Sequence, residues 1–336
     1  MLSIKENLKK HKEAIKRALS LGSIMLATLI CSSFLFLAII IPLPNNLKSP
    51  VTLLLKPGYS SHHIADILQQ NNVIRSKWFF LLYVKVIATN KKLIAGEYEF
   101  LPKKSLKQIV TEISKGESIV RKITIPEGLS SKQIVDLLNN EPRLSGSISE
   151  IPKEGTLFPD TYKFKYGDLR TRIIKAMEDK MTDTIAKLQP RIPKNGLIRN
   201  VDDLIKLASI VEKEAANDSE KPLVASVFLN RLKKKMKLQA DPTIIYGITM
   251  GSNNLGRELS KKDLETDAPY NSYTNFGLPP TPIACPGLKA LEAVLKPAQT
   301  NYLYFVVNGS GGHSFSSNLS DHNNNVKNYR ELQKKK

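Results

Sequence analysis

The first feature of the hydrophobic pattern is an apolar run at residues 21–43 that carries no charged side chain. Roughly 20 apolar residues in a helix span the roughly 30 Å hydrocarbon layer of a bilayer, so the run predicts a transmembrane helix, with a buried core helix as the alternative. Residues 1–20 are rich in lysine, and basic residues are sparse after the run until Lys48. This asymmetry predicts a cytoplasmic N-terminus and an external remainder. The Pro-containing exit favours an uncleaved anchor over a signal peptide.

Residues 50–102 predict a strand, two helices and a second strand. Val51–Lys56 is a strand-like apolar stretch, Ser60 is a candidate cap for the first helix, and a second helix can start at Ser76. The alternating residues 96–100 complete the order β-α-α-β. This order resembles a LysM module, a small fold that binds glycans containing N-acetylglucosamine. A small structural domain of the same topology is the alternative.

Two further regions follow, with a mixed pattern of helices and strands. Residues 103–152 weakly repeat the strand, turn and capped helix, and we interpret them as a connecting α/β segment. Residues 153–330 combine helices, one of them predicted over 169–188, with a late strand at 302–307. The predicted fold class is therefore α+β, with one transmembrane helix, a LysM-like module and a mixed α+β catalytic domain, because the strands and helices do not alternate regularly.

Composition narrows the partners only slightly. The 336 residues hold 50 Lys and Arg against 31 Asp and Glu, a formal net charge of +19. Such an excess favours nucleic acid, anionic lipid or an acidic polymer, but a generally basic proteome explains it equally well. No nucleic-acid motif accompanies the charge, so nucleic-acid binding is not predicted. Cys31 and Cys285 lie far apart in sequence, and no disulfide framework is expected.

The sequence offers no cofactor site. Gly309–Gly312 lacks the Lys-Ser/Thr of a phosphate-binding loop. His313 and His322 have no partner at metal-ligand spacing. No Gly-x-Ser-x-Gly elbow or nucleophilic cysteine arrangement is present either. We therefore expect neither a metal nor a cofactor.

A capped amphipathic helix within residues 200–217 carries the candidate chemistry. Its apolar stripe is formed by Leu204, Leu207, Ala208, Val211 and Ala215. Glu212 and Glu214 are roughly 200° apart around the axis, so they flank the stripe on opposite sides. Glu214 has the bulkier apolar neighbours, and desolvation there would raise its pKa towards that of a general acid. An ordinary surface glutamate is the alternative on this pattern alone.

Several ordered motifs resemble one enzyme family. Leu-Ala-Ser-Ile-Val-Glu-Lys-Glu at residues 207–214 is followed by Val-Ala-Ser-Val-Phe-Leu-Asn-Arg-Leu at 224–232. Further motifs lie at residues 154–155, 158–162, 236–243, 245–247, 270–273, 277–283, 286–287, 302–306, 311–315 and 322–323. With the single predicted span, they resemble the endolytic murein transglycosylases, also called MltG or YceG-like. The resemblance covers essentially the whole chain after the span.

The resemblance implies a specific chemistry. In that family the second glutamate of the Glu-x-Glu pair is taken as catalytic, which is Glu214 here, with Glu212 as the alternative. It would protonate the oxygen between N-acetylmuramic acid and N-acetylglucosamine, and the muramic C6 hydroxyl would close into a 1,6-anhydro end. The resemblance also implies nascent peptidoglycan strands as substrate, penicillin-binding synthases as partners and a location at the outer face of the cytoplasmic (inner) membrane.

Other motif residues are candidates for contact with the substrate. They are Asn230, Gln239, Asp241, Tyr246, Asn271, Tyr273, His313 and Glu212. The amides could bind acetamido or hydroxyl groups and the tyrosines could stack on sugar faces, but each side chain could equally serve the fold. Asp241 is the obvious second acid, and a position facing Glu214 would favour a two-carboxylate muramidase-type hydrolase. A non-catalytic peptidoglycan-binding scaffold is the remaining alternative.

Overall fold

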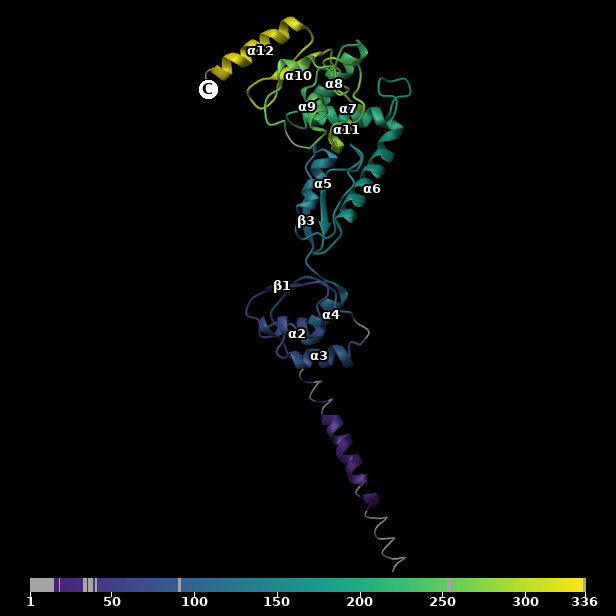
Figure 1. The fold of residues 1–336 in the computed structure, drawn as a ribbon, viewed down its shortest axis with the longest axis vertical. Helices are drawn as coiled ribbons and strands as arrows, with labels where there is room; N and C mark the ends of the chain where they lie inside the picture. The colour runs from purple at the N-terminus through teal and green to yellow at the C-terminus, as the bar shows by residue number, and fades with distance from the viewer. Residues whose placement is uncertain are drawn as a thin grey trace, which may run out of the picture. The chain divides into compact units, whose positions relative to one another are not determined.

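The computed structural model describes residues 15–17, 19–32, 35, 39, 41–89, 92–252 and 255–334. The chain folds into two compact units (Figure 1). The first unit comprises the residues up to Val120 together with Lys165–Gly167, and the second comprises Arg121–Phe164 and the residues from Asp168 onward. Ile15–Ser32 is a helix long and apolar enough to cross a membrane, and none of it is buried. It overlaps the predicted span, while most of the predicted tail and of residues 33–40 lies outside the described residues.

The first unit is a two-stranded antiparallel sheet packed against helices. β1 (Val51–Leu55) pairs with β2 (Gly96–Phe100); α2 (Ser61–Gln70) and α3 (Lys77–Val86) connect them, and α4 (Leu106–Lys115) follows. The predicted order β-α-α-β is therefore present, while its likeness to LysM stays a prediction. Its largest fully buried side chains are Tyr98, Phe80, Phe100, Leu55, Leu68, Ile109 and Ile113.

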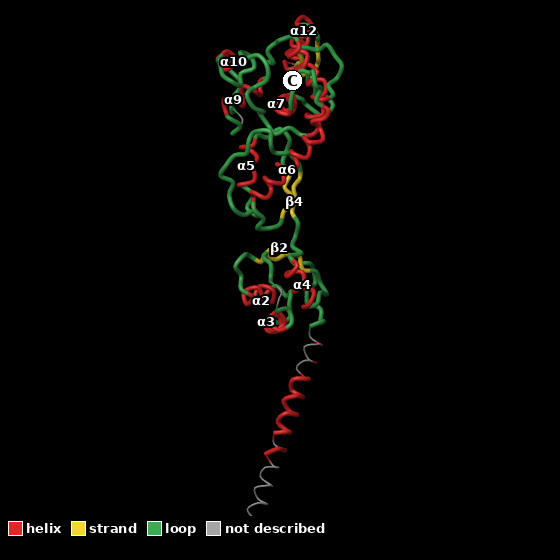
Figure 2. The backbone as a smooth tube through the Cα atoms, turned by 90° about the vertical axis from the view of Figure 1, so that its right-hand side faces the viewer, coloured by secondary structure: helices red, strands yellow, loops and turns green. Residues whose placement is uncertain are grey.

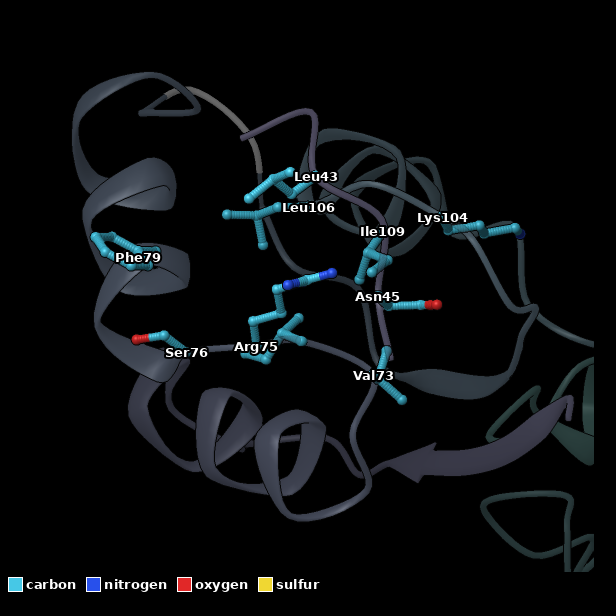
Figure 3. A pocket seen from close by; sticks show the side chains of 10 residues that line it. Leu43, Asn45, Val73, Arg75, Ser76, Phe79, Lys104, Leu106 and Ile109 are labelled. Carbon is cyan, nitrogen blue, oxygen red and sulfur yellow. The ribbon is translucent and has the colours of Figure 1, made fainter. Parts of the chain in front are cut away.

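A small hollow in the first unit lies beside the start of α3 (Figure 3). Leu43, Arg75, Phe79 and Lys104 are among the side chains that line it. Its volume of about 30 Å³ equals roughly the share of one water molecule in the liquid. The hollow is therefore too small for a sugar ring.

The second unit begins with another antiparallel ribbon. β3 (Arg121–Thr124) pairs with β4 (Thr161–Phe164). α5 (Ser131–Asn139) and α6 (Arg170–Leu188) share one apolar core with this ribbon. The short 3-10 turn η1 (Gln189–Arg191) follows α6. This pairing joins the predicted connecting segment 103–152 to the predicted domain 153–330. The connecting segment is accordingly divided, because α4 packs in the first unit.

The remaining elements of the second unit form a mainly helical body with one hairpin (Figure 2). In chain order they are α7 (Val201–Glu214), α8 (Lys221–Lys233), α9 (Asp241–Thr249), α10 (Lys261–Glu265), α11 (Leu288–Leu295), β5 (Tyr304–Val307), β6 (His313–Ser316) and α12 (Leu319–Lys334). Helices α7, α8 and α11 pack together around one core, and α12 lies against the hairpin. The α+β class is thus confirmed.

The hairpin corrects one sequence interpretation. We predicted a single late strand, which β5 confirms, but β6 pairs with it in antiparallel register. The glycine-rich stretch between them forms the turn, where Gly309 and Gly311 have φ of +79° and +88°. Asn308 stabilises the turn because its side-chain oxygen accepts hydrogen bonds from Ser310 N and Gly312 N at 2.8 and 3.2 Å. The stretch Gly309–Gly312, which does not match a phosphate-binding loop, is instead a turn signal between two strands.

Candidate active site

Helix α7 brings two glutamates to its C-terminal end. Asn200 caps the start of the helix, where its side chain accepts a hydrogen bond from Asp203 N at 2.8 Å. The predicted stripe is fully buried in the core at Leu204, Leu207, Ala208 and Val211. The helix ends because Ala215 adopts an extended backbone, with φ −70° and ψ 130°. Glu212 and Glu214 therefore lie in the last turn, where the negative end of the helix dipole disfavours an ionised carboxylate.

The surroundings of the Glu214 carboxyl group favour its neutral form. Its side chain is partly buried and has no hydrogen bond or ion pair within the described part of the chain. Burial raises the pKa of Glu214 to about 8; the charge of Asp241 adds to the shift, and the charge of Arg231 opposes it. The carboxyl is therefore protonated at neutral pH, and no neighbour holds its proton. A general acid needs this protonation state.

Arg231 provides the buried positive charge that acts on Glu214. Its side chain extends from α8 and the residue is 7% exposed. Among the described residues, the guanidinium donates only to neutral acceptors, at 2.7 to 3.1 Å: Leu303 O, Lys237 O, Leu238 O and Gln239 Oε1. It also lies 5.1 Å from the ring centroid of Tyr304. These contacts fix the cation and also orient Gln239, a predicted substrate residue that is exposed at the surface.

Asp241 and Tyr273 form the other side of this cluster. Asp241 is the first residue of α9, and its Oδ1 accepts a hydrogen bond from the Tyr273 hydroxyl at 2.7 Å. Ser272 holds the two segments together, because its Oγ accepts from Ala240 N at 2.9 Å. Burial raises the pKa of Tyr273, and the bond to Asp241 adds to that shift, so the hydroxyl stays a donor. The structure thus gathers the predicted residues Glu214, Asp241 and Tyr273 around one electrostatic site.

Glu212 has very different surroundings. Its carboxylate forms an ion pair with Lys221 at 2.8 Å and accepts a hydrogen bond from Gly287 N at 2.9 Å. Lys221 is 4% exposed and also pairs with Glu127 and Asp218. Burial raises the pKa of Glu212, and the bonds from Lys221 and Gly287 oppose that shift. This carboxylate ties α7 to the starts of α8 and α11.

Four other predicted substrate residues have structural partners. The Asn230 amide donates to Thr300 O and Tyr302 O, at 2.9 and 3.0 Å. The buried Asn271 amide donates to three backbone carbonyls: Asp263 O, Leu264 O and Thr266 O. His313 Nδ1 lies 2.8 Å from Glu220 Oε2, and the Tyr246 hydroxyl donates to Glu154 Oε2 at 3.1 Å. Each of these bonds secures a loop or a helix, so sugar contact by these residues stays a prediction.

Sequence reasoning overlooked three residues that organise the site. Lys221 and Arg231 supply the two buried cations, and Glu154 joins α9 to the start of α5, where it also accepts a hydrogen bond from Ser131 N at 2.8 Å. Arg231 and Glu154 lie in the motifs given above, but the role of a charged side chain depends on which distant groups it contacts in the fold. Among the described residues, no three His, Cys, Asp or Glu side chains gather as a possible metal site.

The fold and site define an α+β protein that holds a carboxylic acid in its neutral form at the end of a buried helix. The chain belongs to the YceG-like family, whose profile matches residues 53–328. It is similar to a Bacillus subtilis protein named endolytic murein transglycosylase, at 34% identity over 84% of this chain and 85% of that protein. A Streptococcus pneumoniae D39 protein of the same name is 28% identical over 85% of this chain and 60% of its own length. The crystal structure of a YceG-like protein from Listeria monocytogenes matches with a TM-score of 0.51 and 33% identity, covering 83% of this chain and 99% of that one.

Proposed function

We propose that the chain is an endolytic lytic transglycosylase that cuts the bond between N-acetylmuramic acid and N-acetylglucosamine in nascent peptidoglycan strands. Family membership and the printed name of the relatives support an enzyme of this class. The observation that carries the assignment to a residue is the state of Glu214, a protonated carboxyl without a bonded partner among the described residues, whose pKa burial raises to about 8. The neighbouring Glu212 is engaged by Lys221 and Gly287.

The reaction needs one carboxyl group in two protonation states. Glu214 donates its proton to the glycosidic oxygen as the bond from that oxygen to the anomeric carbon breaks. The C6 hydroxyl of the muramic residue then forms the new bond to the anomeric carbon and returns its proton to the Glu214 carboxylate. No water is consumed, and the product ends in a 1,6-anhydro ring. The cationic Arg231 stabilises the transient carboxylate, because its charge favours the ionised form of Glu214.

The apolar helix supports a single-pass location at the cell-wall side of the cytoplasmic membrane. Ile15–Ser32 has the length and composition of a span, and the lysine-rich sequence before it favours a cytoplasmic N-terminus. This orientation puts both units on the outer face, where nascent glycan strands and penicillin-binding synthases are found. We further propose that the β-α-α-β unit holds glycan in the manner of LysM.

The mass of the products tests the assignment. Full-length wild type should release fragments with anhydro ends from purified glycan strands, and Glu214→Gln should release none while retaining its fold. Glu258→Gln is a matched control because Glu258 is an exposed glutamate in the same unit. Undiminished cleavage by Glu214→Gln would refute the catalytic role of Glu214. Wild-type protein that binds strands yet releases nothing would instead favour a non-catalytic scaffold.

A two-carboxylate hydrolase is the second candidate, because the Asp241 charge reaches Glu214. In that mechanism Asp241 would activate a water or attack the sugar, and each fragment with a newly formed reducing end would be heavier by one water molecule than its anhydro counterpart. The bond from Tyr273 and the exposure of Asp241 are compatible with either role. Products of hydrolytic mass, lost in Asp241→Asn, would establish the hydrolase. Anhydro products that persist in Asp241→Asn would exclude it.

A further inference from the structure

A hollow of about 440 Å³ in the second unit adjoins the candidate active site along the chain. Its lining residues are Leu232, Lys235, Met236, Phe276 and Gly277. The volume falls within the roughly 300–1,000 Å³ typical of small-molecule sites. Both lining segments also supply residues of the active site: Leu232 follows Arg231 at the end of α8, and Phe276 lies in the loop that also holds Tyr273. The hollow and the cluster around Glu214 thus share two chain segments.

One wall of the hollow is an exposed aromatic ring. Phe276 is 68% exposed, although phenylalanine is among the most often buried residues. Lys237 Nζ lies 5.3 Å from the ring centroid, a cation–π contact that restrains the ring. Leu232 and Met236 extend the apolar surface next to it. Such a surface suits the carbon-bearing face of a sugar ring, which is flat and weakly polar.

Lysines lie at the hollow and beside it in the chain. Lys235 lines the hollow, and Lys237 contacts the Phe276 ring. Residues 233–237 contain four lysines and no acid, and Lys233–Lys235 are exposed. None of the four forms an ion pair within the described ranges. Unpaired cations beside an apolar wall favour a ligand that combines an apolar face with negative charge. Peptidoglycan strands have this character, since amino-sugar rings alternate with lactyl or peptide substituents that carry carboxylates.

We propose that the hollow is a glycan subsite, in which Phe276 stacks on a sugar ring while Lys235 and Lys237 bind a carboxylate of the attached substituent. The inference rests on the proposed function, and it assigns Lys235 and Lys237 a ligand of defined chemistry. The subsite adds affinity for a strand that extends beyond the bond being cut. Strands too short to reach it gain nothing from it.

Charge-matched variants of the full-length protein test the subsite. Phe276→Ala removes the wall, and the pair Lys235→Gln and Lys237→Gln removes two charges from the rim. The control pair is Lys122→Gln and Lys163→Gln, two exposed lysines that face each other across β3 and β4 in the same unit. Each test variant should raise the KM for long strands by about tenfold, the order expected for one lost aromatic or charged contact. The kcat should stay close to that of wild type, and high salt should abolish the difference between the lysine pair and wild type.

The decisive readout is equilibrium binding of long and short strands in a Glu214→Gln background, where no strand is cut. A fall in affinity for long strands alone, absent in the Lys122 and Lys163 control, would support the subsite. Unchanged affinity in Phe276→Ala, or a loss in the lysine pair equal to that of its control, would overturn it. Failure of the proposed function is distinct, because it would appear as cleavage that persists in Glu214→Gln itself.

Discussion

Replacement of Glu214 by glutamine should change how the stability of the second unit depends on pH. The carboxyl has an ordinary pKa of 4.5 in the unfolded chain and a pKa of about 8 in the folded protein, chiefly because of burial. Between these two values the folded state binds more protons than the unfolded state. The stability of wild type therefore falls as the pH rises through this window. Glutamine has nearly the same shape but does not titrate, so the variant lacks this loss.

The structure also sets the size of the effect. Each pH unit inside the window costs wild type about 1.4 kcal/mol, so about 3 kcal/mol of relative stability is lost between about pH 5 and pH 7. The loss stops growing above about pH 8, where the folded protein also ionises. Partial exposure of the side chain makes these figures upper values. Glu214→Gln should thus equal or trail wild type in acid and exceed it at neutral and alkaline pH.

The measurement must follow the second unit alone. The single tryptophan, Trp78, lies in α3 of the first unit, so its fluorescence does not report on α7. Hydrogen exchange of peptides from α7 and α8 in the full-length protein, in detergent at several pH values, gives the local free energy of opening. Glu258→Gln is the control for loss of an exposed carboxylate in the same unit. Parallel pH curves for wild type and Glu214→Gln would show that Glu214 is already ionised in the fold, and would refute its role as a buried acid.

Three further predictions concern groups around this site. Glu212→Gln should lower the free energy of unfolding of the second unit by about 3 kcal/mol, the lower end for a broken buried ion pair, because Lys221 keeps two other carboxylates. The variant that stays folded should release the same products, and loss of cleavage at full stability would contradict this. Asp241→Asn should lower the pH at which cleavage is lost on the alkaline side, since the Asp241 charge helps to raise the pKa of Glu214. A pH–rate profile of the variant measures this limit, and a shift to higher pH would contradict the prediction. Burial raises the pKa of the Cys285 thiol to about 12, so iodoacetamide at about pH 8 should label Cys285 only after the protein unfolds. Peptide mass spectrometry measures the labelling, and rapid labelling of Cys285 in the native protein would show that the thiol is not buried.

Local patterns predicted the elements of this fold well and their partners poorly. The stripe from Leu204 to Val211 and a capping residue at 200 or 202 predicted the start of α7 to within two residues, because both signals lie within one helix, and the structure has the cap at Asn200. The pairing of β3 with β4 was not predicted, since antiparallel register between Arg121 and Phe164 depends on packing of the intervening helix. For the same reason, the predicted boundary at residue 152 falls between two strands of one ribbon.

The candidate site divides in the same way. Helical periodicity predicted that Glu212 and Glu214 lie on opposite sides of the stripe, and the structure gives them different surroundings: Glu212 pairs with Lys221, whereas Glu214 is affected by the charges of Arg231 and Asp241. The charged groups around each glutamate could not be predicted from the sequence. Lys221, Arg231 and Asp241 come from α8 and α9, and the packing of these helices against α7 depends on the whole core. A burial argument from neighbouring residues could say which glutamate is more desolvated. It could not say which one meets a cation.

The two-residue spacing of these glutamates connects stability to chemistry. A carboxyl at a helix end remains neutral only if the surrounding packing buries it deeply enough to outweigh the pull of a nearby cation, which for Glu214 is Arg231. Glu212 contributes to that packing, because its bonds to Lys221 and Gly287 hold the last turn of α7 against α8 and α11. A Cβ at Gly287 would meet the end of the Glu127 side chain, which would have to move aside and give up its present position beside Lys221. One turn of helix therefore carries an ion-paired carboxylate, Glu212, that fixes its position, and a second carboxyl, Glu214, that burial keeps in its neutral form.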